Sequence, residues 1–246
     1  KKAGLWTDGR YFLQAEEQIS GTGIELVKMR TPGFPEPDQW LKANLEKGSV
    51  VGTDEWNVSV NQFAAMQKSL KEAGISFAEA GDLLTAIWPA RPELPDSPIF
   101  EHELEFACTS RTDKIAAIAS ELEKLGTDLQ IVTALDDLAW TLNLRGSDVE
   151  FNPVFVAYAV VSASKTVLFV TETKVSPELK AKLESENIEV KGYSEITSYI
   201  QHLPKGTKIL IDRDRTNQAI VKNIPADCKI ISGLSIPCQL KAIKSE

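Results

Sequence analysis

The sequence has few of the residues on which disulfide-bonded and metal-bound folds depend. Its three cysteines, Cys108, Cys228 and Cys238, show no C-x-x-C spacing, which argues against a disulfide framework or a zinc ribbon and favours reduced thiols. The two histidines, His102 and His202, form no H-E-x-x-H motif. A two-metal hydrolase needs several convergent oxygen and nitrogen ligands. We therefore predict no catalytic residue, no metal ligand and no cofactor within this chain.

Other functional signals are also missing. No apolar run approaches the ~18 residues that a transmembrane helix requires. The sequence has neither a G-x-S-x-G nucleophile motif nor a glycine-rich phosphate loop. A formal net charge of −8 disfavours nucleic acid and anionic membrane surfaces as main partners. These absences favour a cytoplasmic globular protein without a membrane or nucleic-acid partner.

What the sequence does contain is a duplicated α/β pattern. The strand, turn and helix expected over 3–19 have a looser copy in which Thr7 matches Thr171, 164 positions later. Residues 47–54 match residues 205–212, 158 positions later, and each stretch is a short strand that ends in an aspartate. An ordered series of matches at slowly changing offsets predicts two related α/β domains, each a mixed sheet flanked by helices.

Proline density gives the expected boundaries of these domains. Pro89, Pro92, Pro95 and Pro98 disrupt regular structure, and an acidic stretch follows them. We predict a first domain over 1–92, a linker over 93–109 and a second domain over 110–246, with a hairpin formed by strands over 155–162 and 166–170. In the second domain 61 residues precede Thr171, whereas in the first domain only six precede the matching Thr7. About 55 residues of the first domain are therefore expected to be missing from this sequence.

Two stretches of the sequence resemble motifs of one known family. Residues 6–15 (WTDGRYFLQA) resemble the first non-catalytic domain of the long, three-domain Xaa-Pro aminopeptidases of the creatinase/prolidase superfamily. Residues 133–140 (TALDDLAW), with 143–148 (NLRGSD) and 152–155 (NPVF), resemble the second. Residues 241–246 resemble the segment that enters the third domain. The resemblance thus covers nearly the whole chain, but only the non-catalytic part of the family.

The resemblance implies a function that is completed outside this chain. In the family, a C-terminal pita-bread domain carries two divalent metals, usually manganese, and cleaves peptides that have proline in the second position. This chain would gate peptide access and support assembly, a homodimer included, without activity of its own. Two alternatives stay open: a non-enzymatic binding module of aminopeptidase-like fold, as in histone-chaperone subunits, and part of a prolidase.

The best candidate site residues lie on one polar loop: Arg145, Asp148 and Asn152. A guanidinium and a carboxylate on a loop between an aromatic helix and an apolar strand are suited to contact another domain or the peptide entrance. The competing interpretation is structural. In that interpretation Asp148 caps the turn, Arg145 pairs with it or with a neighbour, and Asn152-Pro153 sets the entry into the next strand.

Overall fold

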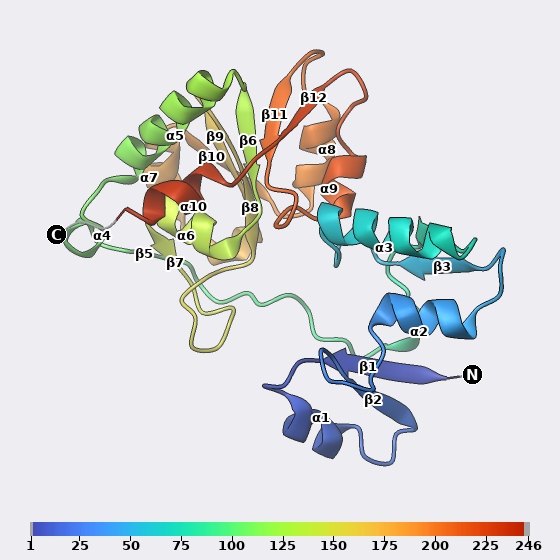
Figure 1. Ribbon diagram of the computed structural model, residues 1–246. Coiled ribbons are helices and arrows are strands. Elements are labelled where there is room, and N and C mark those ends of the chain that lie inside the picture. The colour runs from blue at the N-terminus through green and yellow to red at the C-terminus, as the bar shows by residue number, and fades with distance from the viewer. Residues whose placement is uncertain (1, 244–246) are drawn as a thin grey trace. The chain divides into compact units, whose positions relative to one another are not determined.

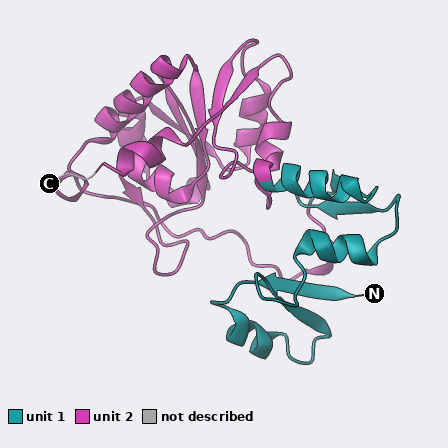
Figure 2. Ribbon diagram, in the orientation of Figure 1, with its two compact units in different colours: residues 1–54, 62–81 teal, residues 55–61, 82–246 magenta. Residues whose placement is uncertain are grey.

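The computed structural model describes residues 2–243 (Figure 1). The last three residues of the segment that resembles the entry to a third domain, 244–246, lie outside the described residues. The chain divides into two compact units, one of residues 1–54 and 62–81 and the other of residues 55–61 and 82–246 (Figure 2). Each unit is an α/β structure, as the sequence predicts.

The first unit contains two separate pairs of parallel strands. Strand β1 pairs with β2, and β3 pairs with β4. Among the described residues, β1 and β3 have no strand partner on their second edge. The elements of this unit are β1 (Ala3–Thr7), α1 (Phe12–Gln18), β2 (Ile24–Lys28), α2 (Pro37–Asn44), β3 (Val50–Thr53), α3 (Val60–Glu72, whose first residues belong to the second unit) and β4 (Ser76–Glu79).

The second unit is built on one six-stranded mixed sheet in the order β10-β9-β8-β6-β11-β12. Its strands are β5 (Phe100–Glu101), β6 (Leu129–Val132), β7 (Leu144–Arg145), β8 (Ala157–Ser162), β9 (Thr166–Val170), β10 (Ile188–Gly192), β11 (Lys208–Ile211) and β12 (Lys229–Ser232), of which β5 and β7 form a separate antiparallel ribbon. The predicted hairpin is confirmed, because β8 and β9 pair antiparallel with Val161 opposite Thr166.

Helices cover both faces of the six-stranded sheet. The helices of the second unit are α4 (Leu104–Ala107), which buries no residue, α5 (Arg111–Leu125), α6 (Leu135–Leu142), α7 (Pro177–Ser185), α8 (Glu195–Gln201), α9 (Gln218–Lys222) and α10 (Ile236–Lys241), with 3₁₀ turns η1 (Thr85–Ile87) and η2 (Glu172–Lys174). Helices α5, α6, α7 and α10 pack on one face, and α8 and α9 pack on the other (Figure 1). Consecutive residues of β8 enter opposite cores, Ala157 and Ala159 on the first face and Tyr158 and Val160 on the second.

The elements confirm the sequence repeat. Strands β3 and β11 have the same bounds at an offset of 158 residues, and so do the starts of α3 and α9. In the second unit, the outer parallel pairs β9–β10 and β11–β12 are joined through β8 and β6. The equivalent pairs of the first unit, β1–β2 and β3–β4, lack such joining strands among the described residues. The first unit thus matches the two outer parts of the second unit's sheet.

One segment of the first repeat is part of the second unit. The loop 55–61 lies along the loop 213–219, and Ser59 forms an isolated antiparallel bridge with Asn217. Val60 N donates to Thr216 O at 3.0 Å, and Gln218 N donates to Val58 O at 2.9 Å. A second pair of bonds runs from Asn61 N to Arg213 O and from Ala219 N to Glu55 O, both at 3.1 Å. We call these two paired stretches the loop clasp.

The expected linker over 93–109 contains structure of its own. Strand β5 and helix α4 lie within it, and Ile99 is buried in the main core of the second unit. Ile99 N donates to Lys174 O at 2.8 Å, and this bond joins the residue before β5 to the end of η2. The predicted domain boundaries stay a prediction, but the part of the expected linker that follows Pro98 packs on the second unit.

Candidate functional site

The loop that carries the predicted site residues leaves the end of helix α6. Asn143 takes a left-handed conformation (φ 48°) at the C-cap of α6 and turns the chain into β7. Its side chain holds this turn, because Nδ2 donates to Thr109 O at 2.8 Å and Oδ1 accepts from Lys114 Nζ at 2.5 Å. Strand β7 then pairs with β5, and residues 146–156 connect β7 to β8. The loop is thus anchored where it begins.

Arg145 binds the end of helix α6 rather than a carboxylate. Its Nη1 donates to Ala139 O at 2.8 Å and to Leu144 O at 2.9 Å. Carbonyls at a helix C-terminus carry partial negative charge and accept hydrogen bonds from a cation. The side chain is half-buried, and burial lowers the pKa of the guanidinium. Arg145 therefore stabilises the junction between α6 and β7.

Asp148 braces the base of the loop from inside the protein. Its side chain is 0% exposed and forms an ion pair with Lys174, which is 1% exposed. Its Oδ2 also accepts from Val156 N at 2.7 Å, so one carboxylate oxygen binds both η2 and the entry to β8. Gly146 lies at the same base, where a Cβ would come within 2.8 Å of Phe155 Cβ. This part of the loop is closely packed and fixed in position.

Asn152 lies at the exposed tip of the same loop. Its N–H donates to Val149 O at 3.1 Å and closes a tight turn over residues 149–152. Within this turn Phe151 is 98% exposed and has φ of 60°. A left-handed conformation is uncommon for a bulky aromatic residue and recurs at functional positions. The structure therefore gives the three predicted residues different positions. Arg145 binds the end of helix α6, Asp148 forms a buried ion pair, and Asn152 lies at the exposed tip. The structure also adds Phe151, which the sequence did not single out.

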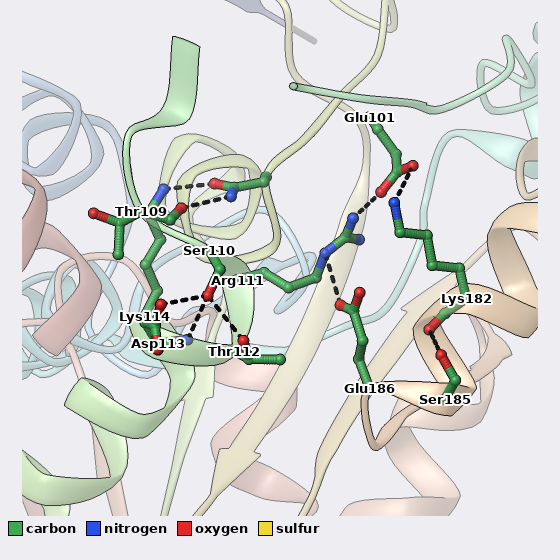
Figure 3. Close-up of polar contacts among 11 residues, drawn as sticks. Glu101, Thr109, Ser110, Arg111, Thr112, Asp113, Lys114, Lys182, Ser185 and Glu186 are labelled. Atoms are coloured by element: carbon green, nitrogen blue, oxygen red, sulfur yellow. Dashed lines mark hydrogen bonds and ion pairs between the residues drawn. The ribbon is translucent and has the colours of Figure 1, made fainter. Parts of the chain in front are cut away.

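A second polar cluster, absent from the sequence-based predictions, lies beside the β5–β7 ribbon. Arg111 is the first residue of α5, and its side chain is only 7% exposed (Figure 3). It forms an ion pair with Glu101 on β5, and its Nε lies 3.0 Å from Glu186 Oε2 at the end of α7. Lys182 Nζ donates to Glu101 Oε2 at 2.8 Å and extends the chain of charges. We call these four residues the Arg111 cluster.

The Arg111 cluster borders a pocket of about 300 Å³. The pocket is lined by Glu101, His102, Glu103, Leu104, Ser110, Arg111, Thr112, Asn143, Lys182 and Glu186. Burial tends to raise the pKa of the Glu101 carboxyl, but the hydrogen bond from Lys182 and the charge of Arg111 outweigh this and lower the pKa. Burial also lowers the pKa of His102, and the nearby cations Arg145 and Lys114 add to that effect.

Lys114 is a buried amine between the two polar sites. It is 5% exposed, and its Nζ donates to Trp140 O at 3.1 Å and lies 4.6 Å from the centre of the Trp140 ring. No carboxylate forms an ion pair with it among the described residues. Burial, assisted by the charge of Arg145, lowers the pKa of Lys114 to about 8. Its proton is therefore held less firmly than that of an exposed lysine.

Metal binding has no structural support in residues 2–243. No group of three or more His, Cys, Asp or Glu side chains in this range could hold a metal ion. His102 stacks on Phe106 with the ring centres 5.9 Å apart, and His202 Nδ1 lies 2.6 Å from Ser198 O at the end of α8. The three cysteines are free thiols. No helix in the described part of the chain is long and apolar enough to cross a membrane.

The fold and these sites define an α/β protein made of two repeated domains, and comparisons with known families identify its class. The family described as "Creatinase/Prolidase N-terminal domain" matches residues 1–87, and a second model with the same description matches residues 90–246. The chain therefore belongs to the creatinase/prolidase N-terminal domain family.

Similar proteins place the chain more narrowly within this family. Xaa-Pro aminopeptidase 1 of Dictyostelium discoideum is 37% identical over 98% of this chain, and aminopeptidase P2 of Arabidopsis thaliana is 34% identical over 93% of it. The crystal structure of X-prolyl aminopeptidase from Caenorhabditis elegans, described as a cytosolic enzyme with a di-nuclear active site, matches with a TM-score of 0.89 at 28% identity and covers 100% of the chain. This chain spans 40%, 32% and 41% of the length of these three proteins, respectively.

Proposed function

We propose that this chain is the non-catalytic N-terminal part of a cytoplasmic, metal-dependent Xaa-Pro aminopeptidase. The proposal rests on one observation: the match covers nearly all of this chain but less than half of the relative. The chain is matched over 98% of its length by a Dictyostelium Xaa-Pro aminopeptidase, yet spans 40% of that protein. The nematode relative has a di-nuclear active site, whereas residues 2–243 offer no cluster of metal-binding side chains. The peptide-cleaving metals, which we expect to be manganese, would thus be bound by a further domain.

The first test asks whether this chain can cleave peptides alone. The purified chain, incubated with Mn²⁺ and a tripeptide that has proline in the second position, should release no N-terminal residue above the rate without protein. The full-length protein under the same conditions should release it in a metal-dependent manner. Peptide release by the chain alone would contradict the proposal, and so would an inactive, folded full-length protein.

In this setting the loop 145–153 is the candidate contact with the catalytic domain or with the peptide. Its base is held by the Asp148–Lys174 ion pair, and a hydrogen bond from Asn152 N to Val149 O closes the turn at its tip. The tip presents Asn152 and the fully exposed Phe151. An exposed aromatic side chain has a large contact area and few rotatable bonds, so it can contribute binding energy at low cost in conformational entropy. We infer that Arg145 and Asp148 position this tip and that Phe151 and Asn152 make the contact.

The second test replaces the tip in the full-length protein. Phe151→Ala should raise the KM for Xaa-Pro peptides by about fivefold or more, with kcat less affected, because a lost ground-state contact weakens binding first. Asn152→Ala should act in the same direction. Ser164→Ala in the exposed turn between β8 and β9 is the matched control and should leave both constants unchanged. If the tip contacts the catalytic domain, Phe151→Ala should instead lower the Tm of the full-length protein but not that of this chain. Unchanged kinetics together with unchanged stability would rule out both roles.

A further inference from the structure

A network of buried polar side chains binds the beginning of helix α10 to the rest of the second unit. Gln130 on β6 is 0% exposed, and its Nε2 donates to Ser235 Oγ at 3.1 Å. Ser235 Oγ in turn donates to Asp137 Oδ2 on α6 at 2.6 Å. Gln130 Oε1 accepts from the N–H of Ile236, the first residue of α10, at 3.3 Å. The start of α10 is therefore bound to both the sheet and helix α6.

The end of α10 is bound to α6 through Lys241. Its Nζ donates to Asp137 Oδ1 and to Asp136 Oδ2, both at 2.5 Å. The side chains of Lys241 and Asp137 are 22% and 3% exposed, so this ion pair is largely shielded from water. The fold thus joins the TALDDLAW stretch (133–140) to the segment that begins at residue 241. We call Gln130, Asp137, Ser235 and Lys241 the α10 latch.

Packing alone does not determine where so short a helix lies. Helix α10 has six residues, and an isolated helix of this length is unstable in water. It lies alongside α6 and buries Ile236 in the core that α5, α6 and α7 share (Figure 1). Apolar contacts have no preferred direction, whereas hydrogen bonds need defined distances and angles. The bonds of the latch therefore determine the register of α10 against α6.

The composition of the latch indicates a role in position rather than in stability. Apolar residues of similar size often stabilise a core at least as well as a buried ion pair does. A buried polar network whose members all have partners, in contrast, specifies one arrangement. Gln130, Ser235 and Asp137 each bind two partners within the latch and α10. The latch is therefore suited to hold α10 in a single place.

We propose that the α10 latch positions the catalytic domain, an inference that rests on the proposed function. Under that function the polypeptide passes from α10, through residues 242–246, into the domain that binds the metals. A helix held in one register fixes the point and the direction from which the chain continues. Gln130, Asp137, Ser235 and Lys241 are then positioning residues, which act through α10 rather than on the peptide.

Amide hydrogen exchange of the full-length protein tests whether the latch holds α10. Lys241→Met keeps an unbranched side chain and removes the cation, so Asp137 remains buried without its counter-charge. The amides of α10 should then exchange about tenfold faster or more, because local opening of this helix becomes easier. Those of α9, which packs in the other core, should be unchanged. Lys124→Met breaks an exposed ion pair with Glu121 and is the matched control. Unchanged exchange of α10 in Lys241→Met would overturn the proposal.

Kinetics of the same protein test whether the latch positions the catalytic domain. Lys241→Met should lower kcat/KM for a tripeptide with proline in the second position by about fivefold or more, chiefly through KM. The reason is that the peptide contacts of the second unit are then displaced from the metals. Lys241→Arg keeps the cation and should keep the parent's KM. Asp137→Asn combined with Lys241→Met leaves no buried charge unpaired, so the Tm should recover in part. Its KM should stay raised, because the end of α10 is still not bound to α6.

The double variant separates positioning from stability. A KM that returns to the parent's value together with the Tm would show a purely structural role and would overturn the proposal. A Lys241→Met variant whose KM equals that of the parent would overturn it as well. A parent protein that cleaves no such peptide would instead contradict the proposed function, and the exchange of α10 does not depend on that activity.

Discussion

Replacing Asp148 by alanine should destabilise the second unit by about 3–5 kcal/mol, because it leaves a buried ammonium group without its counter-charge. The side chains of Asp148 and Lys174 are 0% and 1% exposed, so water cannot take over the role of either partner. The change also removes the acceptor of Val156 N at the entry to β8. Because the chain holds two units, we would follow amide hydrogen exchange of β8 and β9 rather than a single global transition.

A double-mutant cycle separates the ion pair from the packing around it. Lys174→Met alone should cost a similar amount, because Asp148 is then the unpaired buried charge. The double variant should lose clearly less than the sum of the two single losses, with a coupling of about 1–3 kcal/mol. Ser147→Ala, one residue away and exposed, is the control and should lie within about 0.5 kcal/mol of the parent. Additive losses would show that the two side chains do not stabilise each other.

Lys114 should make the stability of the second unit rise with pH in the alkaline range. Its pKa of about 8 in the folded protein lies below the ~10.5 expected in the unfolded chain. Between these values the unfolded chain binds more protons, so stability from this group increases with pH there and is constant below about pH 8. The full difference amounts to about 3 kcal/mol. The titratable groups that interact with Lys114 are Arg145, which stays charged, Cys108, and His102, whose pKa is lowered and therefore lies below the alkaline range.

The measurement compares the parent with Lys114→Met from pH 7 to 10.5, both in a Cys108→Ser background. The advantage of the parent over the variant should grow with pH, because only the parent relieves a buried charge on deprotonation. The hydrogen bonds to Trp140 O and Asn143 Oδ1 are lost equally at every pH and shift the curve without changing its slope. Lys124→Met, exposed and paired with Glu121, should show no such slope. A constant difference between parent and variant would contradict a lowered pKa.

Local patterns in the sequence predicted the repeated elements well. The β8–β9 hairpin follows from two apolar runs around Ala163-Ser164-Lys165, and β3 and β11 follow from matched stretches that end in aspartate. Proline spacing predicted the linker less well, because a proline fixes its own φ but does not prevent later residues from pairing. Strand β5 therefore begins two residues after Pro98, inside the expected linker.

Side-chain partners were harder to predict than elements. Arg145 and Asp148 are close in sequence, but β7 ends at Arg145 and the chain bends at Asp148, so a short separation does not bring the two side chains together. Arg145 accordingly meets α6, and Asp148 meets Lys174, which is 26 residues away. The Arg111 cluster joins β5, α5 and α7 through long-range ion pairs that leave no local pattern. Phe151 gave no signal either, because its exposure depends on a turn that only the folded loop defines.

The loop clasp also relates the two repeats to each other. Each of its four main-chain bonds has a mate at an offset of 158 residues: Val60 with Gln218, and Asn61 with Ala219, as donors. Equivalent residues thus face each other about a local two-fold axis, with Ser59 opposite its own counterpart Asn217. An isologous contact of this kind is what two identical subunits make when they dimerise. The clasp therefore pairs two loops at equivalent positions of the repeat through a symmetric set of main-chain bonds, a local symmetry that the repeat in the sequence makes possible. The symmetry does not extend to every side chain, because Asn61 binds Asp214 and Arg213, whereas its counterpart is an alanine.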